Sequence, residues 1–282
     1  MSMLWLRLYV LLCSPLTWQA FVLGALIGSF LNVCIYRIPA GTFFAHHRSV
    51  CRACNAPIPF YLNIPILSWL LLRGRTRCCG TPLALQYPLV ELLTGVLFVV
   101  IYWRFPFVLL EGGAVAWDSG NMLRAVHAAV FSSLLIICAV IDIRLMIIPD
   151  VISLPMIVLS PLVVYLHPDL DWLSALIGVL VGGGCLYGVA WLYWLIRREV
   201  GMGMGDVKLL AAIGGWLGYQ AIVPTVFYGS LLGALGGLVI MAFSRRLQLR
   251  TAIPFGPFLA LGAIIHLMMG PYIQELMLRY SS

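Results

Sequence analysis

The stretch that decides the fold is LLAAIGGWLGYQAIVPTVFYGSLLGALGGLVIMAFS, residues 209–244. It contains no charged side chain, and it is much longer than the roughly 20 apolar residues that one membrane-spanning helix needs. The polar triplet Gly218-Tyr219-Gln220 interrupts it, so we predict two helices that meet at this break. The chain is therefore expected to cross a bilayer more than once.

Similar stretches fill most of the chain. Residues 88–110 form a further predicted span with Glu91 and Arg104 near its ends. In chain order, the first of the two helices predicted from 209–244 is the sixth span, and it begins close to Asp206. The uncharged spans outside 209–244 are 8–36, 125–141, 151–168, 172–196 and 251–274. The first of these is too long for the apolar core of a signal peptide and is read as a retained span. We therefore expect an all-α integral membrane protein with about eight transmembrane helices.

Composition supports this class and excludes a large soluble domain. Of the 282 residues, 62% are hydrophobic and only 10% are charged, whereas soluble domains carry about 25% charged residues. The net charge of +7 would favour nucleic acid as a partner in a soluble protein. Here the basic residues are expected to anchor loops beside anionic lipid, and no nucleic-acid partner is expected.

The basic residues also set the orientation. Placing the loop 37–87 in the cytoplasm leaves only four basic residues on the far side, as the positive-inside rule demands, and puts both chain termini there. The far-side residues are Arg7, Arg104, Arg124 and Arg279. The cytoplasmic ones are Arg37, Arg48, Arg52, Arg73, Arg75, Arg77, Arg144, Arg197, Arg198, Lys208, Arg245, Arg246 and Arg250.

Half of the eight cysteines lie in the loop 37–87: Cys51, Cys54, Cys78 and Cys79. A reducing cytoplasm does not favour disulfides, and Cys51-Arg-Ala-Cys54 has the spacing of a zinc knuckle. The second pair is adjacent, where a gap of two residues is usual, so inert or partly used thiols are the alternative. We predict one structural zinc ion held by these four residues. The isolated Cys13, Cys34, Cys138 and Cys185 are expected to be small core residues.

Two acidic residues at the predicted membrane edge indicate a catalytic site. Asp142 ends the third span, and Asp206 lies at the entrance to the sixth, so the topology puts both on one face of the membrane. Each alone reads as a solvated helix-end charge. Two carboxylates about 3 Å apart cannot both ionise, however, and this is the chemistry of aspartic proteases. We therefore predict that Asp142 and Asp206 are a catalytic pair.

The neighbours of these aspartates have less specific readings. Glycines 201, 203 and 205 make the approach to Asp206 bare and allow positive φ. Asp150 reads as an N-terminal helix cap. Lys208 either extends to lipid headgroups, our preferred reading, or pairs with Asp206 or a substrate carbonyl. A membrane transporter that uses intramembrane acids is the main alternative function, but transport sites lie near the midplane rather than at one edge.

Several motifs together resemble one family, and they extend over almost the whole chain. They are Gly-Ser-Phe-Leu-Asn-Val at 28–33, Tyr-Arg-Ile-Pro at 36–39, the cysteine loop, Asn-Ile-Pro-Ile-Leu-Ser at 63–68, Tyr-Pro-Leu-Val-Glu-Leu-Leu-Thr-Gly at 87–95, Asp142 with Pro149-Asp150, and Gly-Met-Gly-Asp at 203–206 followed by Lys208. In this order they resemble the type IV prepilin peptidases, the bifunctional leader peptidases and N-methyltransferases of type IV pilus and type II secretion systems.

The resemblance implies an activity, a location and a domain organisation. Such an enzyme cleaves the leader of prepilins or pseudopilins on the cytoplasmic side of the bacterial inner membrane. It then methylates the new N-terminal residue with S-adenosylmethionine. Both termini are then periplasmic. Residues 1–36 are expected to be a first transmembrane segment, 37–87 a zinc-binding loop associated with methylation, and 88–282 the peptidase domain.

The resemblance also assigns roles to residues. Its catalytic aspartates match Asp142 and Asp206. Its zinc ligands match the loop cysteines, except that Thr76 occupies the third position and Cys78 follows two residues later. Glu91 and Gly95 match positions associated with methylation. Their alternative readings are an acid paired with a loop arginine and a residue of close helix packing, respectively.

Overall fold

The structure is a computed structural model that describes residues 14–43, 50–51, 53–111, 114–167, 169–199, 201–243 and 254–281. The expectations for residues 8–13 of the first span lie outside this part of the chain. So do those for Cys13, Arg7, Arg48, Arg52, Arg245, Arg246 and Arg250. The chain divides into two compact units, residues 1–125 and 126–282.

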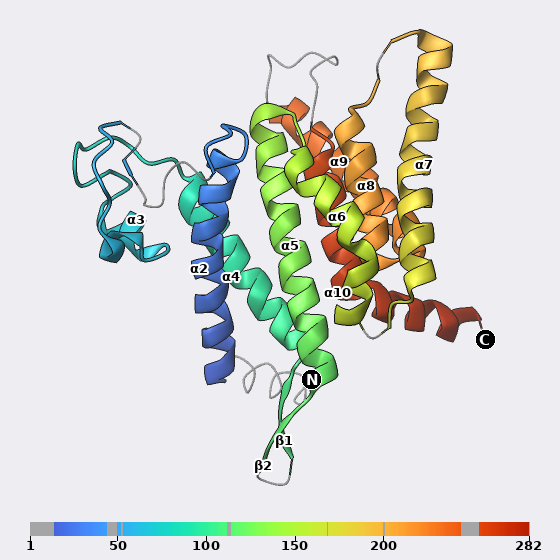
Figure 1. Cartoon of the computed structure of the whole chain (residues 1–282), viewed down its shortest axis with the longest axis horizontal. Coiled ribbons are helices and arrows are strands. Elements are labelled where there is room, and N and C mark those ends of the chain that lie inside the picture. Colours follow the sequence, from blue (N-terminus) through green and yellow to red (C-terminus); the bar gives the residue numbers. More distant parts are fainter. Residues whose placement is uncertain are drawn as a thin grey trace. The chain divides into compact units, whose positions relative to one another are not determined.

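The first unit is built on a helix pair, α2 (Pro15–Arg37) and α4 (Gln86–Arg104), which lie against each other (Figure 1). Small residues let the two backbones approach, as is common between membrane helices. A Cβ on Gly24 would lie only 2.9 Å from the Cα of Gly95. The connecting segment contains the short helices η1 (Phe60–Asn63) and α3 (Leu67–Leu71).

A two-stranded hairpin follows α4. Strand β1 (Val108–Glu111) pairs antiparallel with β2 (Ala114–Trp117). The sequence predicted a helix as far as residue 110, which is wrong for residues 105–110. Helix α4 ends at Arg104. Pro106 lacks the N–H that would continue the helix, and the apolar residues that follow it form strand β1.

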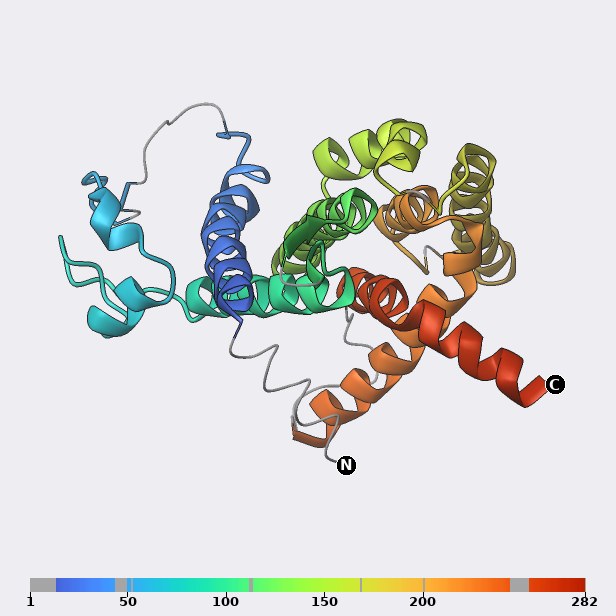
Figure 2. The ribbon, with the colours of Figure 1, turned by 90° about the horizontal axis from the view of Figure 1, so that it is seen from below.

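Helix α5 (Ser119–Leu145) leads into the second unit. The other helices there are α6 (Asp150–Val163), α7 (Trp172–Arg197), α8 (Met204–Leu217), α9 (Ile222–Phe243) and α10 (Gly256–Ser281), with the short η2 (Val164–Leu166) and η3 (Tyr219–Ala221). Helix α8 packs against α7 and α6, and α9 packs against α10 (Figure 2). The backbones of Gly178 on α7 and Gly214 on α8 are in direct contact, which brings these two helices close together.

The predicted break in 209–244 is confirmed. Helix α8 ends at Leu217, and Gly218 has φ 83°, a conformation that ends a helix at little cost for glycine alone. Helix α6 continues through Pro155 and Pro161. Because Pro161 has no N–H, the carbonyl of Ile157 loses its helical partner, and the Ser160 hydroxyl donates to it instead at 2.8 Å.

The all-α membrane fold is confirmed. Within the described residues, eight helices have 14 or more residues, and they follow the eight predicted spans. Five are long and apolar enough to cross a bilayer, namely α2, α4, α5, α7 and the segment Tyr219–Val239. Helix α6 and the segment Gly256–Gly270 are shorter apolar helices.

The isolated cysteines that the structure describes differ in their burial. Cys34 and Cys138 are buried, as expected, but Cys185 is exposed on α7, so its assignment to the core is wrong. In a membrane protein the outer face is apolar as well, because it contacts lipid rather than water. Hydropathy therefore does not separate a core position from a lipid-facing one.

Candidate functional site

The predicted catalytic aspartates lie at one end of the second unit. Asp142 is in the last turn of α5 and Asp206 in the first turn of α8. The C-terminal end of α5 and the N-terminal ends of α6, α8 and α10 gather at this end (Figure 1). The carboxylate of Asp142 is close enough to act electrostatically on that of Asp206. Both acids therefore lie at helix ends rather than in the middle of a span.

Asp142 is held by the start of α10. The backbone N–H of Gly256 donates to Oδ2 of Asp142 at 3.1 Å, and Asp142 as a residue is only 6% exposed. Gly256 is the first residue of α10, so its N–H has no partner inside the helix. A helix N-terminus also carries a partial positive charge, which favours an anion beside it.

Gly256 is a site residue that the sequence analysis missed. A Cβ at this position would lie 2.6 Å from Oδ2 of Asp142, so only glycine leaves the carboxylate its place. The available signal was the run Pro254-Phe255-Gly256-Pro257, a glycine between two prolines at the start of an uncharged span.

The glycines before Asp206 were expected to allow positive φ, but the structure uses them in another way. None of residues 201, 203 and 205 has positive φ, and that of Gly203 is −72°. Gly205 instead allows close packing, since a Cβ there would lie 3.0 Å from that of Ile148. A Cβ on Gly203 would meet only a backbone nitrogen, at 4.0 Å, so this position is bare and open.

Lys208 and Asp150 form an ion pair with 2.7 Å between Nζ and Oδ1. The expected cap is wrong, because Pro149 occupies the N-cap position of α6 and Asp150 follows it. The headgroup and Asp206 readings of Lys208 are replaced by this pair, which links α6 to α8. The side chains are 32% and 56% exposed, so the pair contributes at most about 1 kcal/mol to stability.

The loop cysteines of the first unit lie in two similar hairpins. An isolated β-bridge closes each of them, Val50 with Pro57 and Arg75 with Pro82. In the first hairpin, the N–H of Cys51 donates to the carbonyl of Ala56 at 2.8 Å. The N–H of Asn55, which has φ 55°, donates back to the carbonyl of Cys51.

The second hairpin repeats this pattern with different residues. The N–H of Thr76 donates to the carbonyl of Thr81, and the N–H of Gly80, which has φ 69°, donates to the carbonyl of Thr76. Thr76 is therefore the counterpart of Cys51, and Cys79 that of Cys54. The second hairpin thus has threonine where the first has its leading cysteine.

Cys78 supplies the missing sulfur. The distances between Sγ atoms are 3.6 Å for Cys51 and Cys79, 3.4 Å for Cys54 and Cys78, and 3.8 Å for Cys78 and Cys79. All four sulfurs lie within 4.8 Å of one another. Zinc–sulfur bonds of about 2.3 Å in a tetrahedron require about 3.8 Å between sulfurs. The four cysteines are thus arranged so that they could hold one metal ion.

The thiols also respond to one another electrostatically. Hydrogen bonds from the hydroxyls of Thr76, at 3.2 Å, and Thr81, at 3.1 Å, lower the pKa of Cys79 to about 6. Hydrogen bonds with Cys54 and Cys51 raise the pKa of Cys78 to about 12, because neighbouring thiolates would repel each other. A dication would supply the positive charge that four thiolates need, so the donor set fits a metal.

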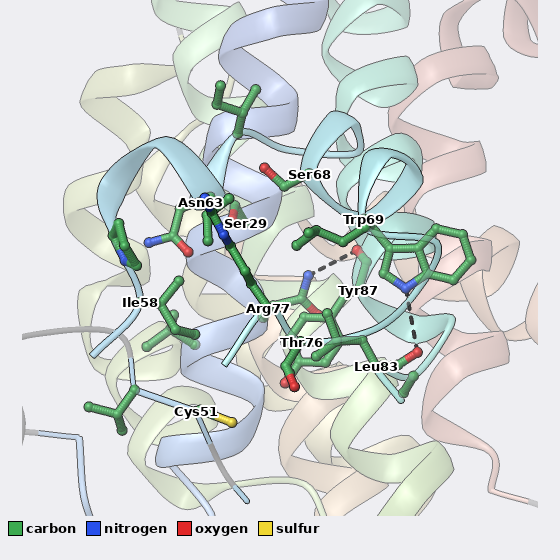
Figure 3. A pocket seen from close by; sticks show the side chains of 18 of the residues that line it. Ser29, Cys51, Ile58, Asn63, Ser68, Trp69, Thr76, Arg77, Leu83 and Tyr87 are labelled. Carbon is green, nitrogen blue, oxygen red and sulfur yellow. Dashed lines mark hydrogen bonds between the residues drawn. The ribbon is translucent and has the colours of Figure 1, made fainter. Parts of the chain in front are cut away.

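A cavity of about 1010 Å³ lies between α2, α4 and the loop in the same unit (Figure 3). Glu91 of α4 contributes to its wall and is 7% exposed. Its Oε2 accepts a hydrogen bond from the N–H of Ile66 at 2.7 Å, so its partner is a loop amide rather than the loop arginine of the alternative reading. Gly95 does not line the cavity, because it faces the ring of Phe21 on α2.

Comparison with known proteins gives the family. The family model described as "Type IV leader peptidase family" matches residues 129–238, and that of the "Bacterial Peptidase A24 N-terminal domain" matches residues 22–105. A prepilin leader peptidase/N-methyltransferase of Stutzerimonas stutzeri is 33% identical and covers 93% of both chains. The chain belongs to the type IV leader peptidase family.

Further members of the type IV leader peptidase family show similar likeness. Proteins with the same name from Aeromonas hydrophila and Pseudomonas aeruginosa are 35% and 34% identical. They cover 90% and 92% of this chain and 91% and 92% of their own length. No solved structure matches the chain. Asp142 and Asp206 lie inside the matched leader peptidase segment, and the loop cysteines, Glu91 and Gly95 inside the N-terminal one.

Proposed function

We propose that this protein is an aspartic endopeptidase that removes the leader of type IV prepilins or pseudopilins and N-methylates the new N-terminal residue. The peptidase proposal rests on the arrangement of Asp142 and Asp206. They lie at helix ends at the same end of the second unit, their carboxylates interact electrostatically, and both belong to the segment that matches the family. The names of the relatives supply the substrate class and the second activity.

The two aspartates are given different roles. The N–H of Gly256 and the N-terminus of α10 favour negative charge on Asp142. We assign Asp142 as the carboxylate that accepts a proton and Asp206 as the carboxylic acid that donates one. We infer that the pair shares one proton, because a negative charge on Asp142 disfavours a second negative charge on Asp206.

Hydrolysis then needs no covalent intermediate. Asp142 takes a proton from water while the water oxygen attacks the scissile carbonyl carbon, and Asp206 donates its proton to the carbonyl oxygen. The tetrahedral intermediate carries two hydroxyl groups. When it collapses, the C–N bond breaks, the amine takes the proton held by Asp142, and one hydroxyl returns its proton to Asp206 as the carbonyl re-forms.

The substrate must be extended at the cleavage site, because a helical amide is engaged in its own hydrogen bonds. The bare backbone at Gly203, one turn from Asp206, gives an extended chain room to approach. The positive-inside rule supports a cytoplasmic position for the loop 37–87. Because successive predicted spans cross the membrane in alternate directions, this end of the second unit then also lies on the cytoplasmic side of the inner membrane, and the chain termini lie in the periplasm.

The second activity belongs to the first unit. S-Adenosylmethionine, when bound, supplies a methyl group on a positively charged sulfur to the free amine. The two cysteine hairpins would hold a structural zinc ion through Cys51, Cys54, Cys78 and Cys79, and this ion fixes the loop beside α2 and α4. It takes no part in peptide hydrolysis.

The test uses purified full-length protein in lipid nanodiscs with an intact prepilin, followed by mass spectrometry of the product. We expect loss of the leader with or without S-adenosylmethionine, and one added methyl group only when it is present. An intact prepilin under both conditions would overturn the peptidase proposal. A cleaved product that never gains a methyl group would overturn the methyltransferase proposal.

A further inference from the structure

The cavity of the first unit has features that no peptidase step uses. We propose that it is the binding site for S-adenosylmethionine, with the carboxylate of Glu91 facing the sulfonium. This inference rests on the proposed methyltransferase activity and adds to it the place where the methyl donor binds and the residues that recognise it.

The size of the cavity suits such a ligand. Small-molecule sites usually measure about 300–1,000 Å³. This one, at about 1010 Å³, can enclose a nucleoside joined to an amino acid. Its wall combines a few polar groups with many apolar ones, which is typical of a binding site rather than of a packing defect.

Glu91 provides the first specific contact. It is almost fully buried, and its carboxylate receives hydrogen bonds from the N–H of Ile66 and the hydroxyl of Ser29. Burial disfavours the ionised form of this side chain, and the two donors act in the opposite direction and stabilise it. Among the described residues, Glu91 forms no ion pair. A buried carboxylate of this kind is best compensated by a cation, and a sulfonium is one.

The Ile66 contact shows that the carboxylate is fixed in place. Ile66 has φ 63°, an unfavourable conformation for a β-branched residue, and it directly precedes α3. The hydrogen bond to Glu91 holds this strained turn against α4. The carboxylate is therefore preorganised before any ligand binds.

Asn32 is an independent sign of a ligand. It lines the cavity and is 2% exposed. Its Nδ2 donates to the carbonyl of Tyr87 at 3.1 Å, whereas its buried Oδ1 has no hydrogen-bond partner in the described structure. Such an unpaired acceptor costs about 1–3 kcal/mol unless a donor reaches it. The exocyclic amine of adenine or a ribose hydroxyl would be that donor.

The remaining walls match the other ends of the molecule. The rings of Tyr36 and Tyr87 stack with their centroids 5.8 Å apart and form an aromatic surface suited to adenine. Arg77 extends across the cavity toward Ser29 and Asn63 (Figure 3). Its guanidinium can bind the carboxylate of the methionyl part.

The cysteine hairpins form part of the same wall, since Cys51, Thr76 and Cys78 line it. A metal in the cluster would therefore hold Arg77, which lies next to Cys78, in position. This gives the metal centre a role in donor binding without any role in the chemistry.

The test is calorimetric binding of S-adenosylmethionine and of S-adenosylhomocysteine, which lacks the positive charge, to zinc-loaded full-length protein. Glu91→Gln keeps the shape of the side chain but removes its charge. We expect it to weaken S-adenosylmethionine binding by about tenfold or more and to change S-adenosylhomocysteine binding far less. A purely structural role of Glu91 would weaken both ligands equally.

A matched pair of arginines provides the control. Arg77→Ala should weaken both ligands, because both carry the methionyl carboxylate. Arg75→Ala, two residues away in the same hairpin but not in the cavity wall, should leave binding unchanged. Zinc content and prepilin cleavage at the wild-type level show that each variant is folded.

The outcomes separate the site from the activity. If the wild type methylates its product but Glu91→Gln and Arg77→Ala bind both ligands as the wild type does, the site is wrong and the methyltransferase proposal stands. If the wild type neither binds S-adenosylmethionine nor methylates, the methyltransferase proposal itself fails and this inference fails with it.

Discussion

The backbone N–H of Gly256 donates to Oδ2 of Asp142 across 114 positions of sequence, so the start of α10 holds a carboxylate at the end of α5. We expect Gly256→Ala to reduce prepilin cleavage by about 100-fold, because displacing a catalytic group by about 1 Å has an effect of this size. The added Cβ would lie 2.6 Å from Oδ2, and the end of a side chain moves more easily than two helices. The fold should therefore persist while turnover is lost.

The control for this variant is Gly184→Ala on α7, where an added Cβ meets nothing within 4 Å. It should cleave like the wild type. The measurements are steady-state cleavage of prepilin and thermal unfolding of both variants. Wild-type turnover in Gly256→Ala would show that Asp142 does not need its bond to α10.

The Lys208–Asp150 pair should matter little to catalysis. Both side chains are partly exposed, so Asp150→Asn or Lys208→Ala should cost at most about 1 kcal/mol of stability and change kcat/KM by less than about tenfold. Urea unfolding and cleavage kinetics check this. A loss as large as that of an Asp206 variant would place the pair among the groups that act on the substrate.

The similarity of the two cysteine hairpins predicts how substitutions change the affinity for zinc. Cys78→Ser should lower zinc affinity, because one of four thiolates is lost. Adding Thr76→Cys to that variant should restore it, because Thr76 occupies the position that Cys51 has in the first hairpin.

Elemental analysis and competition with a chelator measure both metal-centre variants, with Cys185→Ser as a control outside the cluster. Full zinc content in Cys78→Ser alone would mean that water or another side chain is the fourth ligand. A double variant without zinc would show that the two hairpins are not equivalent.

Methylation should separate from proteolysis at Glu91. Glu91 lies in the first unit and both aspartates lie in the second. We therefore expect Glu91→Ala to give cleaved but under-methylated product, because its carboxylate holds the Ile66 turn at the cavity. The mass of the product and its rate of formation report both activities. Equal loss of cleavage and methylation would instead indicate that Glu91 supports the fold as a whole.

The sequence predicted what depends on local pattern. Hydropathy located the helices and the break at Gly218, and cysteine spacing indicated a metal cluster. The contacts of Gly256 with Asp142 and of Lys208 with Asp150 were missed, because they depend on how distant helix ends meet. The exposure of Cys185 was missed because lipid-facing and core positions are equally apolar. The sequence also predicted that Cys78 belongs to the cluster. What it did not show is that the two cysteine segments are similar hairpins in which Thr76 is the counterpart of Cys51.

The central claim is that Asp142 and Asp206 together hydrolyse the peptide bond. The most direct test is the cleavage rate of a purified prepilin by Asp142→Asn and by Asp206→Asn, each reconstituted in nanodiscs and shown to be folded by a thermal unfolding transition like that of the wild type. Each substitution keeps the size of the side chain but removes its ability to share a proton. We predict that neither variant produces detectable cleaved product, whereas near-normal turnover by either one would contradict the assignment of the pair.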